Sequence, residues 1–248
     1  MKTPETSIII RAKNEERWIK QVLEKLFAQT YKDFEVIVID SGSSDETLSI
    51  VSKFSVKVVN ILPEEFSYPH ALNVGVENSK GKKYIAILSA HSVPISNTWL
   101  EDGIRHFSRS NVLGVYGSLK ALPDSTVWDK LFHSLSYIKE KIHSFPRGYR
   151  IIKKGGIGVL GFTNAIIRKD LWFEHNFNEE YGYGGEDGEW LNYWIERGYI
   201  AVKDLKVSVY HSHYLNLNQW QKQITHWRKI SKPISFKKLS YRTGNTHK

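Results

Sequence analysis

Short apolar runs alternate with amphipathic segments along the first part of the chain. Each run has the composition of a buried strand and is too short to span a membrane; the runs lie at 7–10, 35–40, 56–61 and 84–88. Between the first two runs, Trp18, Val22 and Leu26 recur at helical spacing, and we expect Asn14 to cap this helix, with Glu15 in its first turn. Ser43 and Glu46 form a capping-box pattern that predicts the start of another helix. This alternation predicts a three-layer α/β domain with a mostly parallel sheet.

After Pro94 the regular alternation ends. We expect an amphipathic helix at 127–142 and a mobile, glycine- and lysine-rich loop at 147–161. Further strands are predicted at 112–119, 165–167 and 207–210, and further helices at 186–198 and 219–230. No repeat or linker interrupts this order. We therefore predict one domain over 1–231, with halves at 1–94 and 95–231, and a basic tail at 232–248.

Composition narrows the chemistry. The chain of 248 residues has no cysteine, which excludes disulfides, thiolate metal sites and a cysteine nucleophile. It carries 35 basic and 26 acidic residues, and this excess of +9 attracts anions such as nucleotides and phospholipid head groups. Part of the excess lies in the tail, which is interpreted either as a solvated segment or as a contact with anionic membrane. The chain shows neither a secretory signal nor an apolar run of membrane length, so a cytoplasmic protein is expected, peripheral on the inner face of a membrane.

Candidate binding residues follow the first two strands. Asp40 ends the second strand, where a carboxylate can accept from a ribose hydroxyl or a base N–H. Arg11 or Lys13, after the first strand, can face a diphosphate. Alternatively, Asp40 is a turn residue that bonds its own backbone. The chain lacks the glycine patterns of a Rossmann dinucleotide site or a P-loop after these strands.

Two carboxylates, Glu186 and Asp187, follow a glycine loop at the predicted start of a helix. They either stabilise the helix dipole or supply a general base where a loop can close on substrate. Aromatic residues near this loop suit a sugar ring or a protein core; they are Tyr181, Tyr183, Trp190 and Trp194.

Three histidines, His91, His211 and His213, each follow a predicted strand. If these strand ends converge, the imidazoles could hold a divalent metal, although spacing alone does not show convergence.

Three segments in this order resemble the family-two glycosyltransferases of the GT-A fold; they are 7–15, 36–47 and 185–190. The resemblance extends from about Ser7 to about Trp227 and is closest to bacterial cell-surface polysaccharide enzymes, including rhamnosyltransferase-like members. It implies a nucleotide-sugar donor, contact of Asp40 with the base or ribose, and Asp187 as the catalytic base of an inverting transfer. The fold that it implies is a single GT-A-type α/β/α sandwich with acceptor-side helices.

The chain departs from the family at the metal motif. The family usually has Asp-x-Asp after the fourth strand, where this chain has Ser89-Ala90-His91. Either His91 replaces the aspartate as a ligand, or the enzyme works without metal, or the protein is a non-catalytic relative. The intact Glu186-Asp187 argues against the last option. We expect a divalent metal, Mn²⁺ or Mg²⁺, held by His91 with His211 and His213.

The sequence thus predicts an inverting glycosyltransferase that moves a hexosyl or deoxyhexosyl group from a nucleoside-diphosphate sugar to a glycan or lipid-linked acceptor. The catalytic candidates are Asp187 and Glu186. The nucleotide-binding candidates are Ile10, Arg11, Lys13, Asp40, Ser41, Ser89 and Ala90, and the sugar or acceptor candidates are Thr163, Asn164 and Trp190. No nucleic-acid partner is expected. The alternatives are a nucleotidyltransferase-like enzyme and a nucleotide-sugar-binding protein without activity.

Overall fold

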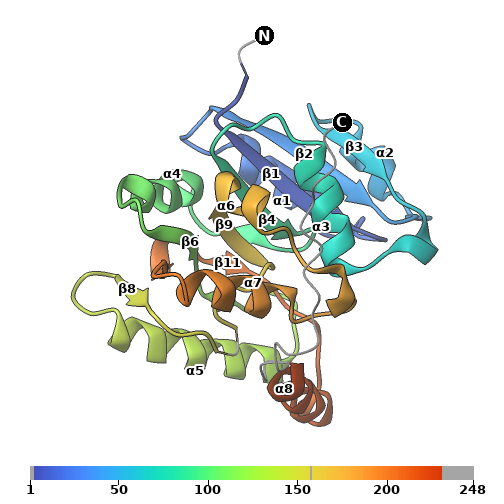
Figure 1. Cartoon of the computed structure of the whole chain (residues 1–248). Helices are drawn as coiled ribbons and strands as arrows, with labels where there is room; N and C mark the ends of the chain where they lie inside the picture. Colours follow the sequence, from blue (N-terminus) through green and yellow to red (C-terminus); the bar gives the residue numbers. More distant parts are fainter. Residues whose placement is uncertain (1–2, 157, 231–248) are drawn as a thin grey trace.

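The four apolar runs of the amino-terminal half form neighbouring parallel strands in the computed structural model, which describes residues 3–156 and 158–230 (Figure 1). These strands are β1 (Thr6–Ala12), β2 (Phe34–Asp40), β3 (Lys57–Asn60) and β4 (Tyr84–Ser89). Ile9 of β1 pairs with Ile37 on one side and Ile87 on the other. The predicted parallel arrangement is confirmed, and the carboxyl ends of these strands lie at one edge of the sheet.

Within the described residues the main sheet has eight strands, in the order β3-β2-β1-β4-β9-β6-β10-β8. The strands of the second half are β6 (Val112–Tyr116), β8 (Tyr149–Ile152), β9 (Asn164–Arg168) and β10 (Ile200–Asp204). Strand β9 runs antiparallel between β4 and β6. The expectation of a loop throughout 147–161 was wrong, because this stretch contains β8, which pairs antiparallel with β10.

A second sheet of three short strands lies beside the end of β4. It consists of β5 (Val93–Pro94), β7 (Leu119–Lys120) and β11 (Val209–Tyr210). Strand β11 pairs antiparallel with β5, with Tyr210 opposite Val93. This pairing places the residues that follow β11 next to the turn that follows β4, although the two segments are more than a hundred residues apart in sequence.

Helices cover both faces of the main sheet. Helices α1 (Ile19–Phe27), α2 (Thr47–Val51) and α4 (Trp99–Ile104) contribute to one apolar cluster, and α3 (Tyr68–Glu77), α6 (Lys169–Glu174) and α7 (Glu186–Ile195) contribute to a second. Alternate strand residues point to opposite faces, so Ile8 and Ile10 join the first cluster while Ile9 joins the second. This arrangement is the predicted three-layer sandwich.

Two predicted helix starts were wrong. The hydroxyl of Ser43 donates to Asp40 and does not cap a helix; instead Asp45 Oδ1 accepts from the Thr47 N–H at 2.9 Å. Asn14 has a positive φ of 54° and lies in a turn, and helix α1 begins only at Ile19. Instead, side chains connect the turns after β1 and β2 to each other: the Asn14 N–H donates to the Ser43 hydroxyl at 2.9 Å, and the Ser44 N–H donates to Asn14 Oδ1 at 2.8 Å.

Below the main sheet in Figure 1 lie the two remaining α-helices of the described chain, α5 (Val127–His143) and α8 (Leu217–Ile230). The amphipathic pattern correctly predicted α5. Among the described residues, we find no helix that combines the length and the apolar character needed to cross a membrane. The predicted basic tail at 232–248 lies outside the described residues.

Candidate functional site

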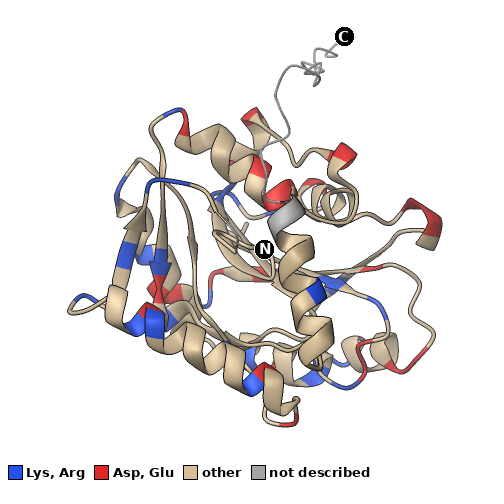
Figure 2. Ribbon diagram, turned by 90° about the horizontal axis from the view of Figure 1, so that it is seen from below, with Lys and Arg blue, Asp and Glu red and all other residues tan. Residues whose placement is uncertain are grey.

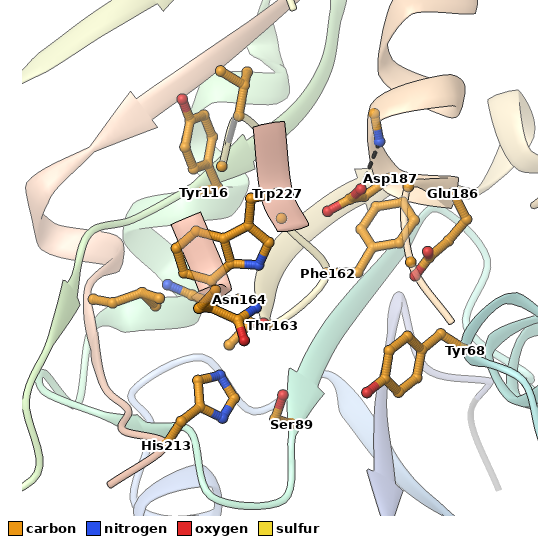
Figure 3. A pocket seen from close by; sticks show the side chains of 18 of the residues that line it. Tyr68, Ser89, Tyr116, Phe162, Thr163, Asn164, Glu186, Asp187, His213 and Trp227 are labelled. Carbon is orange, nitrogen blue, oxygen red and sulfur yellow. Dashed lines mark hydrogen bonds between the residues drawn. The ribbon is translucent and has the colours of Figure 1, made fainter. Parts of the chain in front are cut away.

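A cavity of about 1110 Å³ opens at the carboxyl ends of β1, β2 and β4. Its walls also include the loop before β9, the start of α7, and the inward sides of α5 and α8 (Figure 3). Most of the predicted site residues line it: Arg11, Lys13, Ser41, Ser89, His91, Thr163, Asn164, Glu186, Asp187 and His213. Segments from both halves of the chain therefore form one site.

The other predicted residues lie behind the cavity wall. Ile10 and Ala90 are completely buried, and neither is among the residues that line the cavity. Trp190 was expected to contact a sugar, and its position contradicts this: its ring is 0% exposed, belongs to the apolar core and donates to the His175 carbonyl at 2.7 Å. The indole is part of the helix–sheet packing because it points to the sheet side of α7.

Glycines control the start of α7. Gly184 and Gly185 have φ values of 136° and 103°, a region that side-chain-bearing residues rarely adopt. They allow the chain to turn so that Glu186 and Asp187 occupy the first turn of the helix. In Figure 3, Asp187 points into the cavity near Phe162, and Glu186 turns toward Tyr68. Asp187 Oδ1 accepts from the Gly188 N–H at 2.7 Å.

The nearest cation to this carboxylate pair is Arg11. Its Nη1 lies 4.0 Å from Glu186 Oε1, and its guanidinium lies over the ring of Tyr68, 4.7 Å from the centroid. Its Nη2 donates to the Phe162 carbonyl at 3.4 Å. Arg11 was expected to face a diphosphate, whereas in this structure it faces the carboxylates. It connects the end of β1 to the start of α7.

Burial makes ionisation of both carboxylates costly. Glu186 is 4% exposed, and this burial, with repulsion from Asp187, raises its pKa to about 7 despite the attraction of Arg11. Burial also raises the pKa of Asp187, opposed by the Gly188 N–H and by Arg11. One cation thus serves two acids, and a raised pKa brings a carboxylate closer to the range in which it can take up a proton near neutrality.

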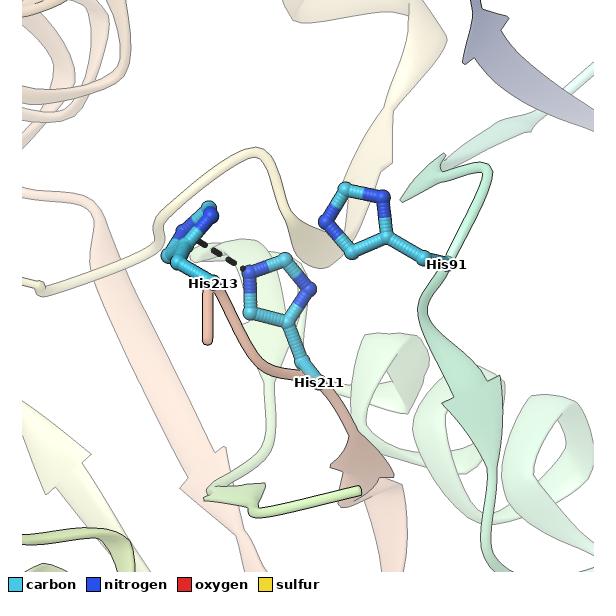
Figure 4. A group of neighbouring side chains, drawn as sticks. All are labelled: His91, His211 and His213. Carbon is cyan, nitrogen blue, oxygen red and sulfur yellow. Dashed lines mark hydrogen bonds between the residues drawn. The ribbon is translucent and has the colours of Figure 1, made fainter. Parts of the chain in front are cut away.

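The three candidate histidines converge (Figure 4). Each offers a ring nitrogen within 4.8 Å of the others. The Nε2 atoms of His211 and His213 are 3.1 Å apart, and the ring of His91 stacks on that of His211 with centroids 4.6 Å apart. The cause is the pairing of β5 with β11, which the sequence did not reveal. Burial lowers the pKa of His211 well below its ordinary value and also lowers the pKa of His213.

Neighbouring side chains orient two of these rings. His91 Nδ1 lies 2.8 Å from Glu15 Oε1, and His211 Nδ1 lies 3.1 Å from the Ser92 hydroxyl. These contacts leave the Nε2 atoms facing the common space, and the buried His91 Nε2 has no hydrogen-bond partner. Metal-binding imidazoles in proteins typically have this arrangement, with the second nitrogen hydrogen-bonded to a carboxylate or another polar group.

Asp40 occupies a different environment from the one that direct nucleotide contact would require. It is 2% exposed, and its Oδ2 accepts from the Gly42 and Ser43 N–H groups at 3.0 Å each. Its other oxygen accepts from the Ser43 hydroxyl. The alternative interpretation, a turn residue that bonds its own backbone, describes this geometry. Ser41, the next residue, lines the cavity.

The side-chain amide of Asn164 is also hydrogen-bonded to other groups of the protein. Its Nδ2 donates to the Val207 carbonyl at 2.7 Å, and its Oδ1 accepts from the indole of Trp99 at 3.1 Å. Thr163 lies beside it on the cavity wall. Asn164 therefore fixes the wall and the start of β9, while its neighbour faces the open space.

Sequence reasoning missed several residues of the site. Glu15 was assigned to a helix terminus, whereas it contacts His91. Tyr68 had no signal in the sequence, because its contact with Arg11 depends on the placement of α3. Phe132 and His133, from the inward side of α5, line the far wall. Only the position of Glu15 in a family-like segment could have indicated a functional role.

The model of glycosyl transferase family 2 matches residues 7–173. Because this match includes more than half of the chain, the protein belongs to this family. The resemblance that the sequence segments indicated is confirmed.

Curated relatives are glycosyltransferases of varied specificity. Glycosyltransferase AglE of Haloferax volcanii is 34% identical over 203 residues, which is 79% of this chain and 63% of that protein. The O-antigen chain rhamnosyltransferase WbaN of Salmonella anatum is 24% identical over 187 residues, 75% of this chain and 58% of that protein. Three other relatives match over 26–36% of their own length, so the chain spans about a third of those proteins.

Solved structures show the same fold. A mannosyltransferase from Pyrobaculum calidifontis, in complex with GDP-Man and Mn²⁺, aligns with a TM-score of 0.64 at 18% identity over 92% of this chain and 63% of that one. Glucosyl-3-phosphoglycerate synthase from Mycobacterium tuberculosis, with Mn²⁺, UDP and phosphoglyceric acid, aligns with a TM-score of 0.61 at 17% identity over 94% of this chain and 80% of that one. The predicted GT-A fold is confirmed.

Proposed function

We propose that this protein is an inverting glycosyltransferase that moves a sugar from a nucleoside-diphosphate sugar to a hydroxyl of an acceptor. One observation carries the proposal: Asp187 points into a cavity whose wall elsewhere contains Ser89 and the histidines that follow β4 and β11. An acceptor hydroxyl held against Asp187 would lose its proton to the carboxylate while its oxygen attacks the anomeric carbon. The diphosphate would leave from the opposite face of the sugar, toward the histidines.

The donor would occupy the edge formed by β1, β2 and β4. The turn that Asp40 holds presents Ser41 to the cavity, and Lys13 is exposed at its rim. We assign the base and ribose to the neighbourhood of Asp40 and Ser41, and the diphosphate to Lys13, Ser89 and the backbone near Ile10 and Ala90. Thr163 and Asn164 would contact the transferred sugar, with Asn164 acting mainly through its backbone because its amide is already bonded.

The histidine cluster fits a divalent ion. The unpartnered Nε2 of His91 and the neighbouring Nε2 atoms of His211 and His213 are suitable ligand atoms, and Glu15 and Ser92 hold the rings in place. Imidazole donors suit Mn²⁺ better than Mg²⁺, which prefers oxygen ligands. Such an ion would stabilise charge on the leaving diphosphate. In support, two structural neighbours were solved in complex with Mn²⁺.

The relatives support a glycan or lipid-linked acceptor in cell-surface polysaccharide or glycolipid synthesis. One is named as an O-antigen chain rhamnosyltransferase. Another, from Methanococcus voltae, is named for transfer to a dolichyl sugar phosphate and is 31% identical over 110 residues, 42% of this chain and 34% of that protein. We propose hexosyl or deoxyhexosyl transfer to an acceptor of this kind.

Replacement of Asp187 by Asn tests the proposal. The amide keeps the shape of the side chain and cannot accept the proton, so turnover should fall by roughly 10²-fold or more while donor affinity survives. Glu180→Gln, which removes an exposed acid before the same helix, is the matched control and should retain activity. Turnover is followed as nucleoside diphosphate released from uridine, guanosine and thymidine diphosphate sugars.

The same assay separates the alternatives. Release of pyrophosphate would indicate a nucleotidyltransferase, and donor binding without turnover would indicate a binding protein. Wild-type turnover in Asp187→Asn would remove this residue as the base.

A further inference from the structure

Helix α5 carries most of its aliphatic side chains on the outside of the molecule. Val127, Leu131, Leu135, Ile138 and Ile142, with Phe145 just beyond the helix, recur every three or four residues and form one stripe, which we call the α5 stripe. Their exposed fractions range from 45% for Leu131 to 83% for Phe145. The helix is about 26 Å long, so the stripe is continuous over most of one side of the domain.

The buried residues on the inward face of α5 are polar, which is the reverse of an ordinary surface helix; they are Asp129, His133 and Glu140. Asp129 is completely buried and accepts from the indole of Trp220 at 2.7 Å. Glu140 accepts two hydrogen bonds from Arg150 and lies 3.2 Å from Lys203 Nζ. These contacts fix the rotation of the helix. The stripe is therefore held outward by paired polar groups and cannot turn inward without breaking them.

Exposed cations surround the α5 stripe. Lys130, Lys139, Lys141 and Arg147 are exposed on the helix and the turn that follows it, and Lys153 and Lys154 are exposed after β8. The two acidic residues between 127 and 156 are Asp129 and Glu140, and both are buried on the inward face. Figure 2, which views the molecule from this side, shows blue segments along α5 and around the neighbouring β8.

This charge pattern indicates which kind of partner could cover the α5 stripe. A second copy of the chain would bring cations against cations with no exposed acid in this segment to pair them. An anionic lipid surface complements both parts of this face. Its acyl chains would contact the aliphatic side chains of the α5 stripe, and its head groups would contact the surrounding lysines. A helix with a large apolar face and basic flanks typically lies in the plane of such an interface.

The opposite side of the same helix faces the cavity. Phe132, His133 and Ser136 of α5 line it together with Asp187. A surface that holds the outer side of α5 would therefore lie one helix diameter from the candidate site.

We propose that the α5 stripe docks the protein on an anionic lipid bilayer, with α5 lying in the interface and its lysines among the head groups. This surface is distinct from the tail, and docking requires no glycosyl transfer. It can therefore be tested whether or not the proposed function holds.

The test compares the full chain with Leu131→Ser/Leu135→Ser/Ile138→Ser, which keeps every charge. Sedimentation with vesicles of phosphatidylcholine mixed with phosphatidylglycerol should recover the wild type, and the partition coefficient of the triple variant should be lower by about ten-fold or more. Leu62→Ser/Phe173→Ser removes exposed apolar side chains elsewhere and should bind as the wild type does. Because the altered side chains are exposed, thermal melting should show all three proteins folded.

A site-specific probe identifies what covers the stripe. The chain has no cysteine, so Leu135→Cys and, off the stripe, His143→Cys can each carry one environment-sensitive dye. Vesicles should shift the emission of the Leu135 dye to the blue and leave the His143 dye nearly unchanged.

Three results would overturn the proposal. The first is equal vesicle binding by wild type and the triple variant, which assigns binding to charge alone. The second is a wild-type dimer by light scattering that the triple variant loses, which assigns the stripe to a second copy. The third is a Leu135 dye already shifted without lipid in a monomer, which assigns the stripe to another segment of the chain.

Discussion

At the scale of single residues, the candidate site has two acidic side chains and one cation beside them. Two adjacent carboxylates, Glu186 and Asp187, share the guanidinium of Arg11, and burial raises the pKa of both. A buried charge without its own partner is costly. The raised pKa values therefore come at the expense of stability, a combination that is common where carboxylates serve a reaction and that fits the proposed role of Asp187.

Neutralising Glu186 should therefore stabilise the protein at alkaline pH. The pKa of its carboxyl is raised from 4.5 to about 7. The protonated side chain therefore stabilises the folded protein fully below pH 4.5, and this stabilisation is lost as the pH rises through about 7. Glu186→Gln removes this loss and leaves one carboxylate for Arg11. We expect a gain of about 1–3 kcal/mol in the free energy of unfolding above the raised pKa and almost none near pH 4.

Urea denaturation of both proteins across this pH range measures the effect. If Glu186→Gln were less stable than the wild type at alkaline pH, attraction to Arg11 would outweigh the cost of burying the second charge.

At the scale of elements, the apolar periodicity of the sequence correctly predicted the layers of the sheet and its helices. It predicted little of the structure of the turns. The alternating residues of β1 and the apolar face of α1 gave the correct layers, because burial on both faces of a sheet leaves a clear pattern. The helix start predicted at Ser43 was wrong, because the Ser43 hydroxyl donates to Asp40 and does not cap a helix terminus. The face of Trp190 was also misread, since an aromatic residue suits a core and a sugar equally well.

The histidine cluster could not have been predicted with certainty for a related reason. Its convergence depends on β5 pairing with β11, and two-residue strands leave almost no periodicity. The antiparallel register that sets Tyr210 opposite Val93 decides it. The inward orientation of the polar face of α5 was likewise hidden, because an amphipathic pattern does not state which face is buried.

A glycine on the neighbouring element should control this cluster. A Cβ added at Gly117, between β6 and β7, would lie 2.0 Å from the carbonyl oxygen of Val207 and 2.5 Å from the Ser208 nitrogen. Both are backbone atoms, so Gly117→Ala must displace the segment that leads into β11 and His211. We expect a loss of about 1–3 kcal/mol in stability, as for overpacked cores, with a weaker affinity for Mn²⁺.

Gly156→Ala is the matched control, because its added Cβ would have an ordinary contact of 3.8 Å with Val159. Thermal melting and calorimetric titration with Mn²⁺ measure the two effects. Unchanged metal affinity in a destabilised Gly117→Ala would show that the histidines do not depend on this close approach.

At the scale of the whole molecule, the site exists only when both halves of the chain are folded together. The predicted nucleotide-binding half supplies Arg11, Ser41 and His91, and the second half supplies Asp187 and His213. Strand β9 of the second half is inserted beside β4. A ligand that contacts both halves therefore stabilises the fold as a whole, and its effect on unfolding reports the assembly of the site.

Metal and nucleotide should accordingly stabilise the protein together by more than the sum of their separate effects. An ion on His91, His211 and His213 would add a partner for the diphosphate, so each ligand raises the affinity for the other. A nucleoside diphosphate at about a hundred times its dissociation constant should add about 2.7 kcal/mol, and more when Mn²⁺ is present. His91→Ala should keep the shift with nucleotide alone and lose the additional shift with Mn²⁺.

His143→Ala, which removes an exposed histidine of α5, should behave as the wild type does. Thermal melting of chelator-treated protein, with uridine, guanosine or thymidine diphosphate and with or without Mn²⁺, decides the question. A nucleotide shift that Mn²⁺ does not increase would exclude the metal assignment and leave His91 as a direct hydrogen-bond partner of the diphosphate.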